Sequence, residues 1–157
     1  MDVLLALGIS IGILIAGWTY VALGPGALPV WAGIVAWGCF FAAGGKMAGL
    51  TKTIASNLSG VLWAYLALTA ATRLGGGVAV LSAMVGIAAM IMVLQAKISA
   101  LSFIPGAFLG AATAVSVVVG ANGTWTRTII ALVAGAVLGY LSEMLAGAMT
   151  GATKQAA

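Results

Sequence analysis

The sequence predicts an all-α integral membrane protein with six transmembrane helices, arranged as a 3+3 inverted repeat. Three observations predict this fold. Hydrophobic residues make up 64% of the chain and charged residues only 5%, whereas a soluble domain carries about 25% charged residues. The apolar runs are continuous and rich in Ala, Leu and Gly, which favours helices over the alternating strands of a membrane β-barrel. Finally, segments of the two halves resemble each other at a constant spacing.

The composition also argues against several classes of function. The chain has no His and a single Cys, Cys39, so we expect neither a His/Cys metal site nor an internal disulfide. The six Lys and Arg residues are dispersed, which does not favour nucleic-acid binding. An intramembrane enzyme needs a nucleophile–base pair or a metal site, and Cys39 has no His partner. We therefore expect no enzymatic activity, no catalytic residue, no metal and no cofactor.

A membrane-spanning helix needs about 20 mostly apolar residues. The first is predicted over residues 3–23, and because a basic region and a cleavage site are missing we expect it to be retained and not removed as a signal peptide. Residues 24–26, Gly-Pro-Gly, end it. The second is predicted over residues 30–43 and is short for a bilayer. Two interpretations remain open: this helix extends to residue 50, or it is a half-helix followed by an irregular turn at Gly44-Gly45.

Four further helices are predicted over residues 53–72, 78–95, 101–119 and 128–148. Pro105 lies in the first turns of the fifth helix, and residues 149–157 form a short C-terminal tail. The loops are too short to hold a soluble domain. Residues 1–157 are therefore predicted to form one transmembrane domain.

A repeat with a spacing of 75 residues links the two halves. The matched segments are Thr51-Lys52-Thr53-Ile54 with Thr126-Arg127-Thr128-Ile129, Gly60 with Gly135, Tyr65-Leu66 with Tyr140-Leu141 and, one residue out of register, Leu28-Pro29 with Ile104-Pro105. Residues 3–73 and 78–148 are thus predicted to be equivalent three-span units. Because three is odd, the second unit enters from the opposite side of the membrane, as in many transporters and channels. Chance similarity between Gly-rich apolar segments is the alternative.

Small residues recur every four positions on several predicted helices, and residues four apart share a helix face. The series on the sixth helix is Ala131, Gly135, Gly139, Glu143, Gly147 and Gly151. Similar series contain Gly8 and Gly12 on the first helix, Gly60 on the third, and Gly106 and Gly110 on the fifth. We interpret these faces either as sites of close helix packing or as a narrow solute pathway. For a pathway, we expect replacement of Gly135 by Leu to block flux.

The candidate residues of such a pathway are Asn57, Gly60, Pro105, Gly106, Thr113, Gly135, Gly139 and Glu143. Asn57 is the best single candidate because an amide offers both donors and an acceptor. The Pro105-Gly106 start of the fifth helix can expose backbone dipoles to a solute.

Glu143 is the only acid within a predicted span. An ionised carboxylate there costs at least about 2.5 kcal/mol on insertion scales, so its side chain should face protein or water. Two interpretations remain open. Glu143 either binds a solute or a proton, or it forms an ion pair with Lys46, Lys97 or Lys154.

Several segments carry a family resemblance. The most specific are Gln95-Ala96-Lys97 and residues 101–111, Leu-Ser-Phe-Ile-Pro-Gly-Ala-Phe-Leu-Gly-Ala, with support from Phe40-Phe41-Ala42 and residues 58–64, Leu-Ser-Gly-Val-Leu-Trp-Ala. Between Gly8 and Tyr140 the chain resembles the YcdZ-like bacterial inner-membrane proteins, a family with a domain of unknown function. The resemblance implies a small multi-span protein of the bacterial inner membrane and transfers no catalytic or binding residue.

The orientation follows from the cations. If both termini are cytoplasmic, that side holds Lys46, Lys52, Lys97 and Lys154, and the other side holds Arg73 and Arg127. The excess favours cytoplasmic termini by the positive-inside rule.

We expect a channel or facilitated-diffusion permease for a small neutral or weakly ionised solute, because ion-coupled pumps usually carry several intramembrane charges. The alternative is a structural or accessory subunit of a larger membrane complex. The expected partners are the lipid bilayer, further copies of the chain and, for the alternative, a membrane-complex partner, but no nucleic acid.

Overall fold

A computed structural model describes residues 2–155, with side chains described for residues 2–151, and this part of the chain folds into helices joined by short connections. The helices are α1 (Val3–Leu23), α2 (Val30–Ala42), α3 (Lys46–Arg73), α4 (Val78–Leu94), α5 (Ile104–Val115) and α6 (Trp125–Gln155). Two 3-10 turns, η1 (Gln95–Lys97) and η2 (Ser99–Leu101), precede α5, and a π-helical turn, η3 (Ser116–Gly120), follows it. The prediction of an all-helical fold is confirmed for the described residues.

The helix ends follow from ordinary capping chemistry. The Asp2 carboxylate accepts hydrogen bonds from the N–H groups of Leu4 and Leu5, at 3.1 and 3.2 Å, and so begins α1. The Thr124 hydroxyl accepts from the Arg127 N–H at 3.2 Å and begins α6 in the same way. Pro105 stands in the first turn of α5, where its missing N–H is not needed.

Some helix boundaries differ from the prediction. α2 is the half-helix of the two alternatives, because Gly44 and Gly45 adopt left-handed backbone angles and end it. α3 therefore begins at Lys46, seven residues before the predicted start. α6 continues to Gln155, so most of the predicted tail is helical, and residues 156–157 lie outside the described residues.

Four helical segments are long and apolar enough to cross a membrane: Val3–Leu23, Lys46–Arg73, Val78–Lys97 and Trp125–Gly151. α2 and α5 have only 13 and 12 residues. At about 1.5 Å per residue they are about 20 and 18 Å long, shorter than the hydrocarbon core of about 30 Å. Four of the six predicted spans thus have full length. α2 and α5 are shorter, and we call them the short helices, although α5 continues through η3 as one apolar helical segment, Ile104–Gly120.

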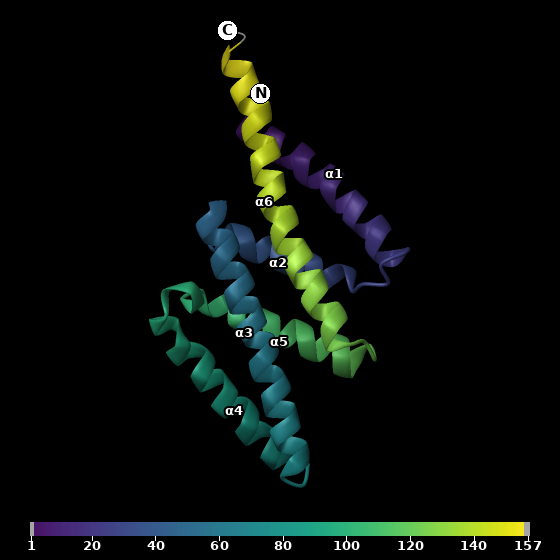
Figure 1. Cartoon of the computed structure of the whole chain (residues 1–157), viewed down its shortest axis with the longest axis vertical. Helices are drawn as coiled ribbons and strands as arrows, with labels where there is room; N and C mark the ends of the chain where they lie inside the picture. Colours follow the sequence, from purple (N-terminus) through teal and green to yellow (C-terminus); the bar gives the residue numbers. More distant parts are fainter. Residues whose placement is uncertain (1, 156–157) are drawn as a thin grey trace.

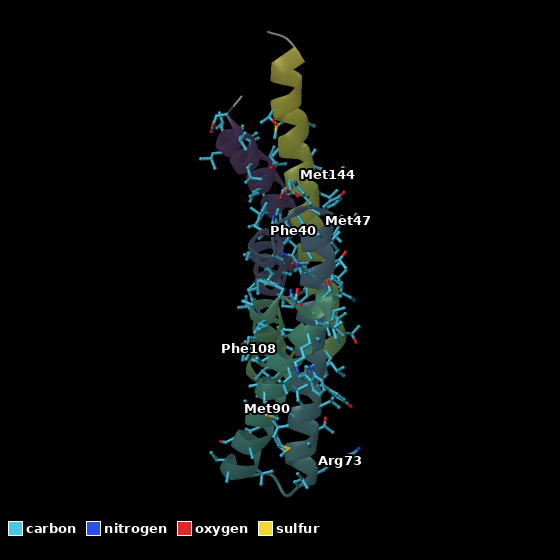
Figure 2. The ribbon with its side chains drawn as sticks, turned by 90° about the vertical axis from the view of Figure 1, so that its left-hand side faces the viewer. Phe40, Met47, Arg73, Met90, Phe108 and Met144 are labelled. Carbon is cyan, nitrogen blue, oxygen red and sulfur yellow. The ribbon has the colours of Figure 1, made fainter. Side chains whose placement is uncertain are left out.

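The two longest helices, α3 and α6, form the middle of the molecule (Figure 1). α5 packs on α3 and α2 packs on α6, while α4 and α1 pack on the outer sides of α3 and α6. α3 also contacts α6, and α2 contacts α5. In Figure 2 the molecule is thin, and Arg73 lies at the end opposite the two chain termini. The centre of the fold is therefore the region where α2, α3, α5 and α6 meet.

Glycines let the backbones touch at two helix crossings. A Cβ atom at Gly60 would overlap the Ala107 carbonyl oxygen of α5, and one at Gly135 would overlap the Gly33 backbone of α2. Such close approach is how small residues hold membrane helices together. Gly8 and Gly12 meet nothing within 4 Å, so the first helix does not pack through them against the other helices of the same chain. α1 instead turns the face that contains Ser10 toward α6, where the Ser10 hydroxyl donates to the Ser142 carbonyl at 2.9 Å.

Candidate functional site

Three polar side chains lie together in the interior of α3. Thr53, Ser56 and Asn57 occupy positions i, i+3 and i+4 of the helix, so they share one face. Their exposed fractions are 0%, 0% and 1%. Four of their polar atoms have no hydrogen-bond partner among the described residues: Thr53 Oγ1, Ser56 Oγ, Asn57 Nδ2 and Asn57 Oδ1. We call these three residues the polar cluster.

The polar cluster lies beside both short helices, α2 and α5. The Ser56 Cβ is 3.1 Å from the place that a Cβ at Gly106, in the first turn of α5, would occupy. One turn further along α5, Gly110 packs on the Asn57 backbone. The Cys39 thiol of α2 lies beside the Asn57 side chain, outside hydrogen-bonding geometry. The cluster is thus enclosed by α2 and α5, at the centre of the fold.

Apart from Thr113 on α5, the other polar side chains that are buried do have partners, namely Ser10, Thr128 and Ser142. The Trp63 indole N–H donates to Gln95 Oε1 at 2.9 Å, and Gln95 Nε2 donates to the Ser59 hydroxyl at 2.8 Å. The Trp37 indole N–H donates to the Ser142 hydroxyl at 3.2 Å. Because each unsatisfied polar atom costs about 1–3 kcal/mol, the polar cluster stands out against these paired groups.

The position 75 residues further along the chain is built without such polarity. There Thr128 donates its hydroxyl to the Thr124 carbonyl at 3.0 Å. Ala131 and Leu132 stand where the first half has Ser56 and Asn57, and both are buried in apolar surroundings. Unpartnered polar atoms are therefore found at this helix position only in the first half.

Glu143 lies at a different place, the turn between α2 and α3. Its Oε2 accepts a hydrogen bond from the Lys46 backbone N–H at 2.6 Å. Gly44, Gly45 and Lys46 have φ angles of 99°, 65° and 57°, a left-handed path that favours glycine. A Cβ at Gly45 would stand 2.6 Å from Glu143 Oε1. The carboxylate of α6 thus caps the positive end of α3, across 97 residues of sequence.

The predicted pairing of Glu143 with Lys46 named the right residue, but this hydrogen bond is made by its main chain and not by its ammonium group. The alternative partner Lys154 has its side chain outside the described residues.

The structure does not gather the eight predicted residues in one site. Asn57, Pro105 and Gly106 lie at or next to the polar cluster. Gly139 packs on the Phe40 ring, and Thr113 is buried on α5. Gly60 and Gly135 lie at the helix crossings, and because Gly135 touches the Gly33 backbone, loss of flux in a Gly135→Leu variant would report lost packing as well as a blocked pathway.

Thr53 and Ser56 were not predicted as site residues. The available signal is their spacing: with Asn57 they place three polar groups on one face of an apolar helix.

The grooves on the surface of the protein are mainly apolar, unlike the polar cluster. One of about 480 Å³ between α3, α4 and α5 is lined by apolar residues such as Ala67, Val85 and Phe108, and Phe108 lies on the outer side of α5 (Figure 2). Another, of about 340 Å³, is lined by Leu58, Tyr65 and Trp125 among others. Neither groove includes the polar cluster, which is closed off inside the protein.

The sequence profile of the family described as "Protein of unknown function (DUF1097)" matches residues 8–147. The chain belongs to this family. Among the relatives of this DUF1097 protein is Inner membrane protein YcdZ of Escherichia coli (strain K12), which is 35% identical over 142 residues, or 89% of this chain and 83% of the relative. Inner membrane protein YcdZ of Salmonella typhimurium is 35% identical over 144 residues, or 89% and 85% of the two chains.

Uncharacterized protein YahC of Escherichia coli (strain K12) is 33% identical to this DUF1097 protein over 153 residues, or 91% and 90% of the two chains. No solved structure matches the chain. The resemblance to YcdZ-like proteins is confirmed, and together with the apolar helices it identifies this DUF1097 protein as a membrane protein.

Proposed function

We propose that this protein is a channel or permease of the bacterial inner membrane for a small neutral or weakly ionised solute, and that it is built as a 3+3 inverted repeat. One observation carries the proposal. The short helices α2 and α5, each preceded or begun by a proline, pack on the long helix of the opposite half, α2 on α6 and α5 on α3. In transporters built from inverted repeats, the solute site lies at the interface between the repeats and is typically formed by interrupted helices.

The remaining packing pairs support the repeat. α1 flanks α6 as α4 flanks α3, and in Figure 1 these two flanking helices lie on opposite margins. In the same view α1 and α3 run downward and α4 and α6 run upward, while α2 and α5 lie across the long axis between them. The opposite course of the long helices in the two halves supports the inverted repeat. For six crossings, we propose that α2 and α5 cross with the help of their adjoining turns. Both termini are then on the same side, and the excess of Lys residues favours the cytoplasm for that side.

The charges favour a neutral solute. Glu143, the one acid within a predicted span, holds the start of α3. The polar groups that remain at the centre of the fold are hydroxyls, an amide and a thiol. A charged solute would lose its water there without gaining a countercharge.

The test is solute flux into proteoliposomes, followed by light scattering after an osmotic step, with urea, glycerol, acetamide and ammonium acetate as solutes. We expect at least one of them to enter faster than into protein-free vesicles. Gly135→Leu on α6 should abolish this flux. Gly147→Leu is its matched control on the same helix, because Gly147 meets nothing within 4 Å, and it should retain the flux of the wild type. Equal rates with and without protein for the whole panel would rule out the proposed function.

A structural role in an assembly is the second candidate, for which one observation speaks. Gly8 and Gly12 are exposed, four residues apart, on the outer face of α1, and such spacing favours contact between membrane helices. We propose a homo-oligomer or a complex with another membrane protein through this face. The mass of the purified particle in detergent, with and without Gly12→Leu, tests this proposal.

A further inference from the structure

We propose that Thr53, Ser56 and Asn57 bind a small neutral solute that both donates and accepts hydrogen bonds, of the class of short amides and polyols. This inference rests on the proposed function for the route by which the solute arrives. Binding at the polar cluster itself can be measured without transport.

The free hydrogen-bonding groups define the ligand class. Asn57 offers an amide N–H₂ and a carbonyl oxygen, and Thr53 and Ser56 offer hydroxyls that both donate and accept. A ligand that only accepts, or only donates, would leave part of this set unsatisfied. None of the three side chains is charged, so an ionic ligand would be desolvated without compensation.

The fold does not require polar side chains at this position. Ala131 and Leu132 fill the corresponding place in the second half with apolar groups. Three other buried hydroxyls, those of Ser10, Thr128 and Ser142, do have hydrogen-bond partners. Four unpartnered atoms gathered on one helix face therefore point to a binding function.

The surroundings limit the size of the ligand. Ser56 faces Gly106, and the Phe103 ring packs on Gly106 from the connection before α5. With exposed fractions of 0–1%, the polar cluster is closed in this conformation. Admission of a solute therefore requires the surrounding side chains to move, and the Phe103 ring, which lies against Gly106, is one of them.

The experiment uses Cys39 as a reporter, because it is the single cysteine of the chain and lies beside Asn57. The rate of Cys39 modification by methyl methanethiosulfonate is measured in the purified protein with and without urea, acetamide or glycerol. We expect at least one of these solutes to slow the modification in the wild type. Asn57→Leu and Thr53→Val should raise the solute concentration that gives half of the maximal protection by about tenfold for each hydrogen bond lost.

Two features keep the test decisive. Asn57→Leu should fold, since Leu132 holds the corresponding place, and circular dichroism and a melting curve check this. Thr128→Val is the matched control for Thr53→Val, because Thr128 is equally buried and already bonded to Thr124, and it should keep the full protection.

The outcomes separate this inference from the proposed function. If no solute of the class protects Cys39, or if Asn57→Leu and Thr53→Val are protected like the wild type, the assigned site is wrong. If flux is present and survives both changes, the permease stands without this site. If protection depends on Asn57 while no solute crosses the vesicle membrane, the site stands and the proposed transport fails.

Discussion

At the scale of single residues, Glu143 shows how a charge can be held in an apolar protein. The N-terminal amides of a helix carry a partial positive charge, which a carboxylate compensates. α6 begins with a local cap, the Thr124 hydroxyl, whereas α3 begins with a left-handed turn and takes its cap from Glu143. Glu143 stands out in the sequence as the only acid within a predicted span, but charge spacing does not reveal a bond to a main-chain N–H.

Removing this cap should loosen the start of α3. We expect Glu143→Ala to lower the free energy of unfolding by about 1–2 kcal/mol, because the charged acceptor of the Lys46 N–H is lost. Glu143→Gln keeps an oxygen acceptor without the charge and should lose less. Melting curves in detergent measure the difference, and hydrogen exchange at the Lys46 amide localises it. If the Ala variant melts like the wild type, the carboxylate does not stabilise the turn.

At the scale of helices, the packing depends on which glycines touch a neighbour. Sequence periodicity placed Gly8, Gly12, Gly60 and Gly135 in equivalent small-residue series, yet only Gly60 and Gly135 meet another backbone. Spacing says which residues share a face, but it does not say which face turns inward. Helix limits were predicted unevenly as well. The continuous apolar runs predicted the limits of α1 and α4 well, whereas the start of α3 is set by the left-handed turn at Gly44-Gly45.

A pair of glycine substitutions tests this distinction. Gly60→Ala places a methyl group against the Ala107 carbonyl and should destabilise the protein by about 1–3 kcal/mol, as overpacking does. Gly86→Ala, in the middle of α4 with nothing within 4 Å, should be neutral or stabilising because alanine favours helix. In one detergent, Gly60→Ala should melt at a lower temperature than the wild type, and Gly86→Ala at the same or a higher temperature. Equal losses would contradict the close crossing of α3 and α5.

At the scale of the whole molecule, composition and hydropathy were sufficient for the membrane class and for the order of the helices. Composition and hydropathy were not sufficient for the packing of the helices, because α2 and α5 are as apolar as the other helices and their short length is set by the turns at their ends. The polar cluster was only partly foreseen, through Asn57, since whether a buried polar group is satisfied depends on neighbours that are distant in the sequence. Likewise, nothing in the sequence of η3 distinguishes a π-helical turn from an ordinary helical one.

The proposed topology makes a prediction about sidedness. In a variant with Cys39 replaced by Ser, single cysteines are introduced as Leu74→Cys, Ala121→Cys and Ser99→Cys, at connections between helices. In spheroplasts with an intact inner membrane, a membrane-impermeant maleimide should label Leu74→Cys and Ala121→Cys. It should label Ser99→Cys only after permeabilisation, because six alternating crossings place this connection on the opposite side. Labelling of Leu74→Cys and Ser99→Cys from one side would exclude this arrangement.

The exchange of packing partners, α2 on α6 and α5 on α3, has a consequence for biosynthesis. During translation α2 and α3 leave the ribosome before either of their main partners from the second half exists. A nascent chain that stops at the turn after Arg73 would present Gly60 and the unpaired groups of Asn57 to the lipid. The protein therefore completes its interior only after the last helix has been inserted.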